Sequence, residues 1–416
     1  MSEVTTVRLS EAKKYMRHHS KKKQPVMIWG PPGVGKSEIV ESIVKDILAG
    51  GRRAKLYDMR LSMCEPTDIM GIPYFDSGTN IDASLMTALF QEVITNIDRD
   101  DKNAIATAKA SFELKCRAMF GDAVGGQMKW APPSLLPKQS DINNYDLVVL
   151  FLDELNGAAP AVQAAAYQLI LNRRVGDYKL PDNVAVFAAG NRESDKGVTY
   201  RMPKPLANRF LHYEVRVNFD DWVEWATDNG VSAEVVGYLT YRKEDLMKFD
   251  PRSADRSFPT PRSWTFVSEM LEDLDPGEFS ETEQADMINA AIGEGTGLQF
   301  SAHRKIASQL PDPQMILKGQ VKDLKTKEMS AMYSLATSLA YELREAQGNV
   351  GRDGFTQDDM NVFLDNVISF WLKHFQEELT VMSARMILKY KVHLAPKKLK
   401  NWDAFFDRFG ELVRNA

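Results

Sequence analysis

One short segment of the 416-residue chain has the residue types and the spacing needed to hold phosphate groups. It reads Gly30-x-x-x-x-Gly35-Lys36-Ser37, and an apolar run at residues 25–29 precedes it. Glycines let the backbone curl so that successive N–H groups point at an anion. The lysine adds an ammonium between the β- and γ-phosphates, and the serine hydroxyl can bind Mg²⁺. The spacing therefore predicts a phosphate-binding loop, or P-loop.

A helix is expected directly after this loop, at residues 38–48, where apolar residues recur at helical spacing. Its N-terminus would present free N–H groups and a positive dipole end to the phosphates. The sequence does not distinguish ATP from GTP, because residues that contact the base cannot be located. We take ATP and Mg²⁺ as the expected ligands. The predicted nucleotide contacts are Gly30, Pro31, Pro32, Gly33, Val34, Gly35, Lys36, Ser37 and Glu38.

Two carboxylates follow the strongest apolar run of the chain. Residues 147–152 are all apolar, and Asp153 and Glu154 come directly after them. Such a run is typical of a buried strand, and ligands bind at the carboxyl ends of parallel strands. Asp153 is then placed to hold Mg²⁺ through its water shell, and Glu154 to polarise an attacking water. The pair predicts hydrolysis of the nucleotide as well as binding.

Three further side chains are candidates to contact the γ-phosphate. Asn191 follows a predicted strand, and Arg209 precedes another. Arg262 follows Thr260 and Pro261, which we expect to be the N-cap and the first residue of a helix. Taken alone, each arginine fits a salt bridge as well as a catalytic role.

Strand and helix patterns alternate through the first half of the chain. We expect strands at residues 25–29, 53–61, 147–152, 183–189 and 210–217, a helix at 160–171, and a broken helix near 83–119. This alternation predicts an α/β P-loop NTPase core, with a parallel sheet covered by helices on both faces.

The strand pattern stops after residue 217, and helical patterns replace it. The expected domains are an α/β nucleotide-binding core at 1–217, an α-helical lid at 218–310 and a C-terminal helical extension at 311–416. Thr356-Gln-Asp-Asp359 is a capping-box pattern that predicts the start of a helix in the extension.

The composition of the chain disfavours several classes of protein. Lys and Arg number 52 against 57 Asp and Glu, a net charge of -5, so binding of nucleic acid by bulk charge is disfavoured. Two cysteines provide no disulfide framework and no thiolate zinc site. With no run of 18 apolar residues and no signal-peptide pattern, we expect a cytoplasmic protein without a membrane span. The glycine loop ends in Lys-Ser, which disfavours a Rossmann dehydrogenase.

The order of these motifs resembles the AAA+ ATPases and, within them, the MoxR-type branch. Besides the P-loop, the resemblance rests on the segments Asp153-Glu-Leu-Asn-Gly and Pro205-Leu-Ala-Asn-Arg-Phe and on the gaps between the motifs. It covers roughly residues 5–300, and residues from about 310 on match no part of that family.

The resemblance implies a role for each of the remaining candidates. Asn191 would be sensor 1, Arg209 a finger that enters the site of a neighbouring subunit, and Arg262 sensor 2 in the lid. It also implies a homo-oligomeric ring, usually a hexamer, that remodels a protein partner as a chaperone, often together with a von Willebrand A domain protein. The segment Ile72-Pro-Tyr74-Phe75 is a candidate for the pore aromatic that grips the substrate, and ordinary loop packing is the favoured alternative.

Two other functions stay open at this stage. The basic stretches at residues 8–23 and 389–400 would suit an ATP-driven nucleic-acid motor or loader, whereas the acidic total and the lack of a recognisable DNA-binding module weigh against it. A nucleotide-gated scaffold with negligible turnover is the third hypothesis. The intact Glu154 weighs against that one.

Overall fold

The computed structural model describes residues 4–414 apart from 77–109, 113, 116–126, 132, 176–177, 196–198, 273, 275–276, 322, 325–326 and 353. The chain divides into two compact units. The first contains Met1–Thr5, Lys13–Trp29 and Ser37–Tyr213, and the second contains Thr6–Ala12, Gly30–Lys36 and Glu214–Ala416. The division into a core at 1–217, a lid at 218–310 and an extension at 311–416 stays a prediction.

A six-stranded sheet carries the motifs of the sequence analysis, with the strand order β1-β10-β2-β9-β6-β3. The strands are β1 (Thr5–Arg8), β2 (Val26–Trp29), β3 (Ala54–Arg60), β6 (Leu147–Asp153), β9 (Val184–Gly190) and β10 (Leu211–Arg216). The pairs β2–β9, β9–β6 and β6–β3 are parallel. With a P-loop between β2 and the helix that follows it, this is the predicted P-loop NTPase fold.

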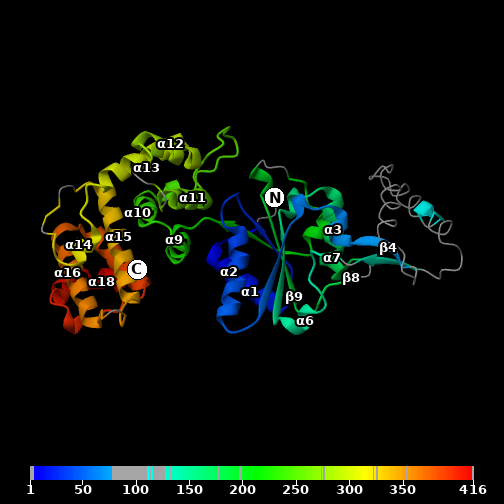
Figure 1. Cartoon of the computed structure of the whole chain (residues 1–416), viewed down its shortest axis with the longest axis horizontal. Helices are drawn as coiled ribbons and strands as arrows, with labels where there is room; N and C mark the ends of the chain where they lie inside the picture. Colours follow the sequence, from blue (N-terminus) through cyan, green and yellow to red (C-terminus); the bar gives the residue numbers. More distant parts are fainter. Residues whose placement is uncertain are drawn as a thin grey trace. The chain divides into compact units, whose positions relative to one another are not determined.

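Helices cover both faces of the central strands. Figure 1 shows α2 (Lys36–Ala49) on one side of the sheet, and α3 (Pro66–Met70) and α7 (Pro160–Asn172) on the other. All seven residues of β9 are buried, and so are six of the seven in β6. Strands covered on both faces are uniformly apolar, which explains why these two segments stand out in the sequence.

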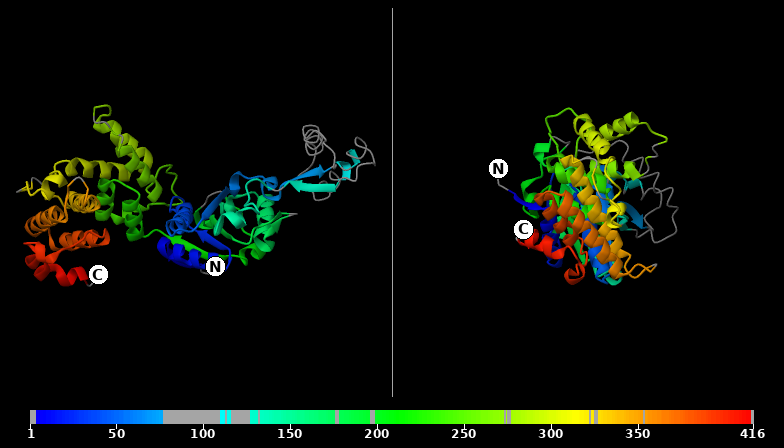
Figure 2. Two further views of the ribbon diagram at one scale, coloured as in Figure 1. Left: turned by 60° about the horizontal axis from the view of Figure 1, so that its bottom comes forward. Right: turned by 90° about the vertical axis from the view of Figure 1, so that its left-hand side faces the viewer.

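The described residues from 219 to 414 hold helices and no strand, as predicted; they appear in green to red in Figure 2. These helices are α9 (Phe219–Asp228), α10 (Ala233–Tyr241), α11 (Pro261–Glu272), α12 (Glu281–Ile292), α13 (Glu294–Ala307), α14 (Pro313–Leu317), α15 (Met329–Gly348), α16 (Gln357–His374), α17 (Glu377–Lys389) and α18 (Trp402–Arg414). Thr356 caps α16 in a capping box with Asp359, which confirms that prediction. No helix among the described residues is long and apolar enough to cross a membrane.

Several elements of the structure are absent from the sequence prediction. They are the edge strand β1, the antiparallel pair β4 (Ile72–Asp76) and β5 (Gln127–Ala131), and the pair β7 (Arg174–Val175) and β8 (Tyr178–Lys179). β7 and β8 have only two residues each, too few for a pattern to register in the sequence. Tyr74 lies in β4 opposite Lys129 and is exposed. Most of the helix expected near residues 83–119 lies outside the described residues.

The contact between α10 and α15 leads to a stability prediction. A Cβ on Gly237 of α10 would lie 2.6 Å from both Cα and Oγ of Ser334 in α15. Gly237→Ala should therefore lower the free energy of unfolding by about 1–3 kcal/mol, because backbone must move. Urea unfolding followed by circular dichroism measures this change.

Gly295→Ala in α13 is the matched control, since a Cβ there meets no atom within 4 Å. That variant should gain about 0.5–1 kcal/mol from helix propensity. Equal stability changes for the two variants would contradict close packing of α10 on α15.

Candidate nucleotide-binding site

The P-loop joins the end of β2 to the start of α2 and has the backbone geometry that its glycines permit. Gly33 and Gly35 have φ values of 74° and 95°, in the left-handed region that favours glycine. At Gly30 the reason is space, because a Cβ there would lie 2.7 Å from Cγ2 of Val215. Helix α2 begins at Lys36, so its first N–H groups lie at the loop as an anion site requires.

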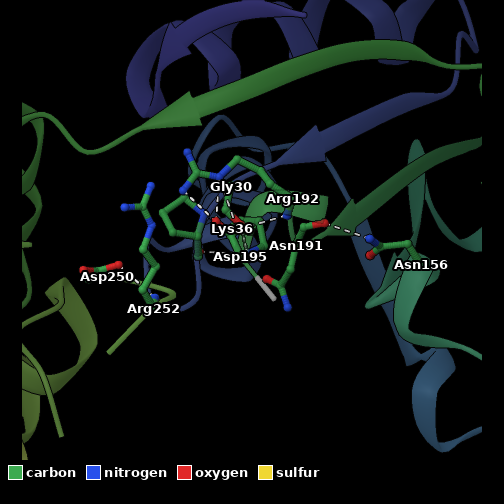
Figure 3. Close-up of polar contacts among 9 residues, drawn as sticks. Gly30, Lys36, Asn156, Asn191, Arg192, Asp195, Asp250 and Arg252 are labelled. Atoms are coloured by element: carbon green, nitrogen blue, oxygen red, sulfur yellow. Dashed lines mark hydrogen bonds and ion pairs between the residues drawn. The ribbon is translucent and has the colours of Figure 1, made fainter. Parts of the chain in front are cut away.

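The ammonium of Lys36 lies against the backbone of the same loop. Its Nζ donates to the carbonyl oxygens of Gly30 at 2.9 Å and Pro31 at 3.0 Å (Figure 3). These acceptors are neutral, whereas a nucleotide phosphate would offer charged oxygens and stronger hydrogen bonds. The contacts therefore leave the ammonium beside the loop that would hold the phosphates.

Two predicted metal-binding residues meet although 115 residues separate them in the chain. The Ser37 hydroxyl donates to Oδ2 of Asp153 at 2.8 Å. Asp153 is only 7% exposed, and its Oδ1 accepts the N–H of Glu154 at 2.8 Å. A hydroxyl and a carboxylate are hard oxygen donors of the kind that Mg²⁺ prefers. The pair therefore fits the metal that accompanies a bound nucleotide.

Glu154 is held in an uncommon conformation beside this pair. Its φ of 55° and ψ of 34° place it in the left-handed region, which costs a residue with a side chain about 1 kcal/mol or more. Its Oε2 accepts a hydrogen bond from the hydroxyl of Ser62. The left-handed backbone turns Glu154 out of the strand direction of β6, and Ser62 fixes where its carboxylate points.

Ser62 and Asp58 are further candidate site residues that the sequence analysis missed. Both belong to β3 or the turn after it, next to β6 in the sheet, where Arg60 is in register with Asp153. Burial raises the pKa of the Asp58 carboxyl, and the charge of Asp153 raises it further. Ser62 directly follows the strand predicted at 53–61, so the rule that ligands bind at carboxyl ends could have identified it.

Asn191 lies at the end of β9, between the strands that carry the P-loop and the two carboxylates. Trp29 of β2 is in register with Gly190, and β9 pairs with β6 on its other side. The buried Asn156 donates its Nδ2–H to the backbone oxygen of Asn191 at 2.7 Å (Figure 3). Asn156 therefore positions the end of β9, a role that no pattern in the sequence indicated.

Arg192, the next residue, was also missed. Its guanidinium forms an ion pair with Asp195 at 2.8 Å, and Asp195 also accepts the Arg192 N–H (Figure 3). Asp195 is buried, so the pair fixes the turn that follows Asn191.

The two candidate arginines differ from Arg192 because their side chains are exposed. Arg209 follows the short helix α8 (Lys204–Ala207), and Arg262 lies in the first turn of α11, where the hydroxyl of Thr260 accepts the N–H of Ser263 at 3.0 Å. Within the described ranges, the guanidinium of neither arginine forms a hydrogen bond or an ion pair. Arg209 belongs to the unit that holds Asp153, and Arg262 belongs to the second unit, with the P-loop residues 30–36.

The P-loop packs against the helix that carries Arg262. A Cβ on Gly33 would lie 2.9 Å from Oγ1 of Thr260, the N-cap of α11. Both segments belong to the second unit.

Comparison with known proteins identifies no family by sequence. No family model matches the chain, and no curated protein matches it. Among solved structures, a putative ATPase from Cytophaga hutchinsonii has 11% identity and a TM-score of 0.30 over 86% of this chain and 80% of its own. NtrX from Brucella abortus has 12% identity and a TM-score of 0.35, over 85% of this chain and 67% of its own. AMPPCP-bound DnaA from Aquifex aeolicus has 10% identity and a TM-score of 0.31, over 94% of this chain and 95% of its own. With all three TM-scores below 0.5, the fold assignment rests on strand order and the P-loop.

The Ser37–Asp153 pair predicts how nucleotide binding depends on metal. Asp153→Asn keeps the size of the side chain but removes its charge, so affinity for an ATP analogue with Mg²⁺ should fall about 10- to 100-fold. Binding in EDTA should stay close to wild type. Titration of a fluorescent ATP analogue with and without Mg²⁺ measures both.

Asp182→Asn is the control, since this carboxylate is exposed and lies outside the site. An equal loss for Asp153→Asn with and without Mg²⁺ would show that Asp153 does not act through a metal.

Proposed function

We propose that this protein is a Mg²⁺-dependent ATPase. The observation that carries the proposal is the hydrogen bond from Ser37 to Asp153, with Glu154 next in the chain. It joins the first turn after a P-loop to the two carboxylates at the end of a buried parallel strand. Nucleotide binding alone requires only the P-loop. Hydrolysis also requires a carboxylate beside the metal site that can activate a water molecule, and Glu154 is placed for this role.

In the proposed reaction, each side chain has one task. The loop N–H groups and Lys36 would bind the β- and γ-phosphates, and Ser37 and Asp153 would hold Mg²⁺, which would neutralise phosphate charge. Glu154 accepts a proton from the attacking water, and the hydroxyl of Ser62 orients its carboxylate. Asn191, fixed through its backbone by Asn156, orients the water or the γ-phosphate.

We further infer an AAA+ protein of the MoxR type that acts as a ring on a protein partner. The strand order supports this, because β9 lies between β2 and β6 and brings Asn191 between the P-loop and the carboxylates. The exposed Arg209 supports it too, since a finger that acts on a neighbouring subunit must be accessible. Hexameric assembly, a von Willebrand A domain partner and a pore role for Tyr74 are parts of this proposal.

A nucleic-acid motor is the less favoured alternative. In the first basic stretch, Lys13 and Arg17 both form ion pairs with Asp46. In the second, Lys389 and Lys398 also have acidic partners. Intramolecular pairing reduces the positive charge available to phosphates, which lowers the electrostatic term that dominates such binding.

Glu154→Gln tests the hydrolytic step. The amide cannot take a proton, so phosphate release should fall at least about 100-fold while ATP binding stays within about twofold of wild type. Phosphate release is measured in a coupled assay, and binding by titration. Glu411→Gln is the control, because it removes an exposed carboxylate from α18. A wild-type rate from Glu154→Gln would refute its role as base.

Arg209→Ala tests the ring and the finger together. The variant should bind ATP normally but hydrolyse it about 1000-fold more slowly. Mixing it with Lys36→Ala, which keeps Arg209 but cannot bind ATP, should restore activity at the mixed interfaces. Arg201→Ala is the matched control, since Arg201 is exposed in the same segment.

Two results would contradict the trans assignment. One is a wild-type rate from Arg209→Ala, and the other is a mixture with no restored activity. Mass photometry of Glu154→Gln with ATP, expected near six times 46.9 kDa, tests the hexamer independently.

A further inference from the structure

A bridge of side chains connects the P-loop strand to the turn that carries Arg209. Trp29, the last residue of β2, directly precedes the P-loop, and His212 lies in the adjacent strand β10. The indole Nε1–H donates to Nδ1 of His212 at 2.9 Å. The two ring planes are 15° apart, with centroids 6.0 Å apart, so the rings lie nearly parallel. Both residues are partly buried, where a hydrogen bond is electrostatically stronger than in water.

The first contact fixes the tautomer of the histidine. An indole N–H can only donate, so Nδ1 of His212 must be the acceptor. A neutral ring then carries its proton on Nε2, and Nε2 lies 2.7 Å from the carbonyl oxygen of Ala207. His212 therefore accepts from Trp29 and donates to Ala207 at the same time.

Ala207 belongs to the turn that presents Arg209. Its carbonyl oxygen also accepts the N–H of Phe210 at 3.2 Å, and the N–H of Arg209 donates to Leu206 at 3.0 Å. Leu206 and Phe210 are buried in the core of the first unit, whereas the side chain of Arg209 is exposed. Two buried apolar side chains therefore hold the turn against the core, and His212 holds it through a hydrogen bond to the Ala207 carbonyl.

We propose that His212 is a positioning residue that couples the end of the P-loop strand to Arg209. The inference rests on the proposed function, because it assumes that Arg209 acts on the site of a neighbouring subunit. The end of β2 leads into the P-loop that would hold a subunit's own nucleotide. Through Trp29 and His212, this strand end also sets the position of the arginine that the subunit presents to its neighbour. Trp29 and Ala207 are the two ends of this connection.

Loss of the bridge should impair the nucleotide site of the neighbouring subunit and spare the subunit's own site, whereas general damage to the fold would impair both. A subunit without the bridge keeps its own P-loop, Asp153 and Glu154, so its own site stays competent. What it loses is the placement of the arginine that it offers to the next subunit. The defect should therefore appear in trans.

The experiment uses His212→Phe, which removes both hydrogen bonds, and Trp29→Phe, which removes the donor to His212. In the 416-residue protein, each should lower kcat about 3- to 10-fold, the effect of one or two hydrogen bonds, with KM and the Kd for ATP unchanged. Mixing either variant with Lys36→Ala subunits, which carry an intact bridge and Arg209, should restore the rate per functional site.

His19→Gln is the matched control. His19 forms the same kind of bridge, with Nδ1 2.9 Å from Gln24 and Nε2 2.8 Å from the hydroxyl of Tyr213, the residue after His212. It contacts no residue of the Arg209 turn in the described structure. His19→Gln should keep the wild-type kcat, and melting temperatures show whether each variant is folded.

The outcomes distinguish the two levels of the proposal. A wild-type protein that does not hydrolyse ATP would overturn the proposed function, and the role of His212 would fall with it. If wild type is active, wild-type kcat in both variants, a raised KM, or a loss that mixing does not restore would each overturn the role of His212 and leave the ATPase assignment intact.

Discussion

The hydrogen bond between Ser37 and Asp153 depends on one constraint, the parallel direction of the central strands. Because parallel strands end at the same edge of a sheet, residues that follow β2, β3, β6 and β9 gather there regardless of their distance in the chain. The P-loop, Ser62, the two carboxylates and Asn191 are placed by this rule. Uniformly apolar strands β6 and β9 make it possible, since burial on both faces fixes their positions.

Polar residues around the site hold functional groups in conformations that the backbone alone would not favour. Glu154 keeps a left-handed conformation beside Asp153, and Ser62 fixes its carboxylate. Asn156 holds the end of β9 from a buried position. His212 likewise orients the turn of Arg209, through its hydrogen bonds to Trp29 and Ala207. Each of these residues acts by orienting a neighbour, which is how enzymes preorganise a site.

The second unit has buried apolar clusters of its own, and one of them lies among α9, α10, α11, α12 and α13. Tyr238 and Trp264 are buried against each other, and both contact Asp245. Burial lowers the pKa of His303 to about 4, so it is neutral at pH 7 and contacts the hydroxyl of Ser334 at 2.7 Å. Contacts between α10 and α15 join the region expected as lid to the start of the expected extension. The packing of Thr260 on Gly33 brings the N-terminus of α11 to the P-loop.

The sequence by itself determined the P-loop, the Asp153–Glu154 pair, the main strands and the caps at Thr260 and Thr356. These are local signals, because glycine spacing, apolar runs and capping patterns act within a few residues. Only the tertiary structure decided which strands are neighbours, and with that the contacts of Ser62, Asn156 and His212. The local sequence does not show which partners these residues take, since Glu154, Asn191 and Trp29 lie dozens of residues away from them. The short strands β1, β4 and β5 were missed for the same reason, because pairing with another strand, and not their own composition, makes them strands.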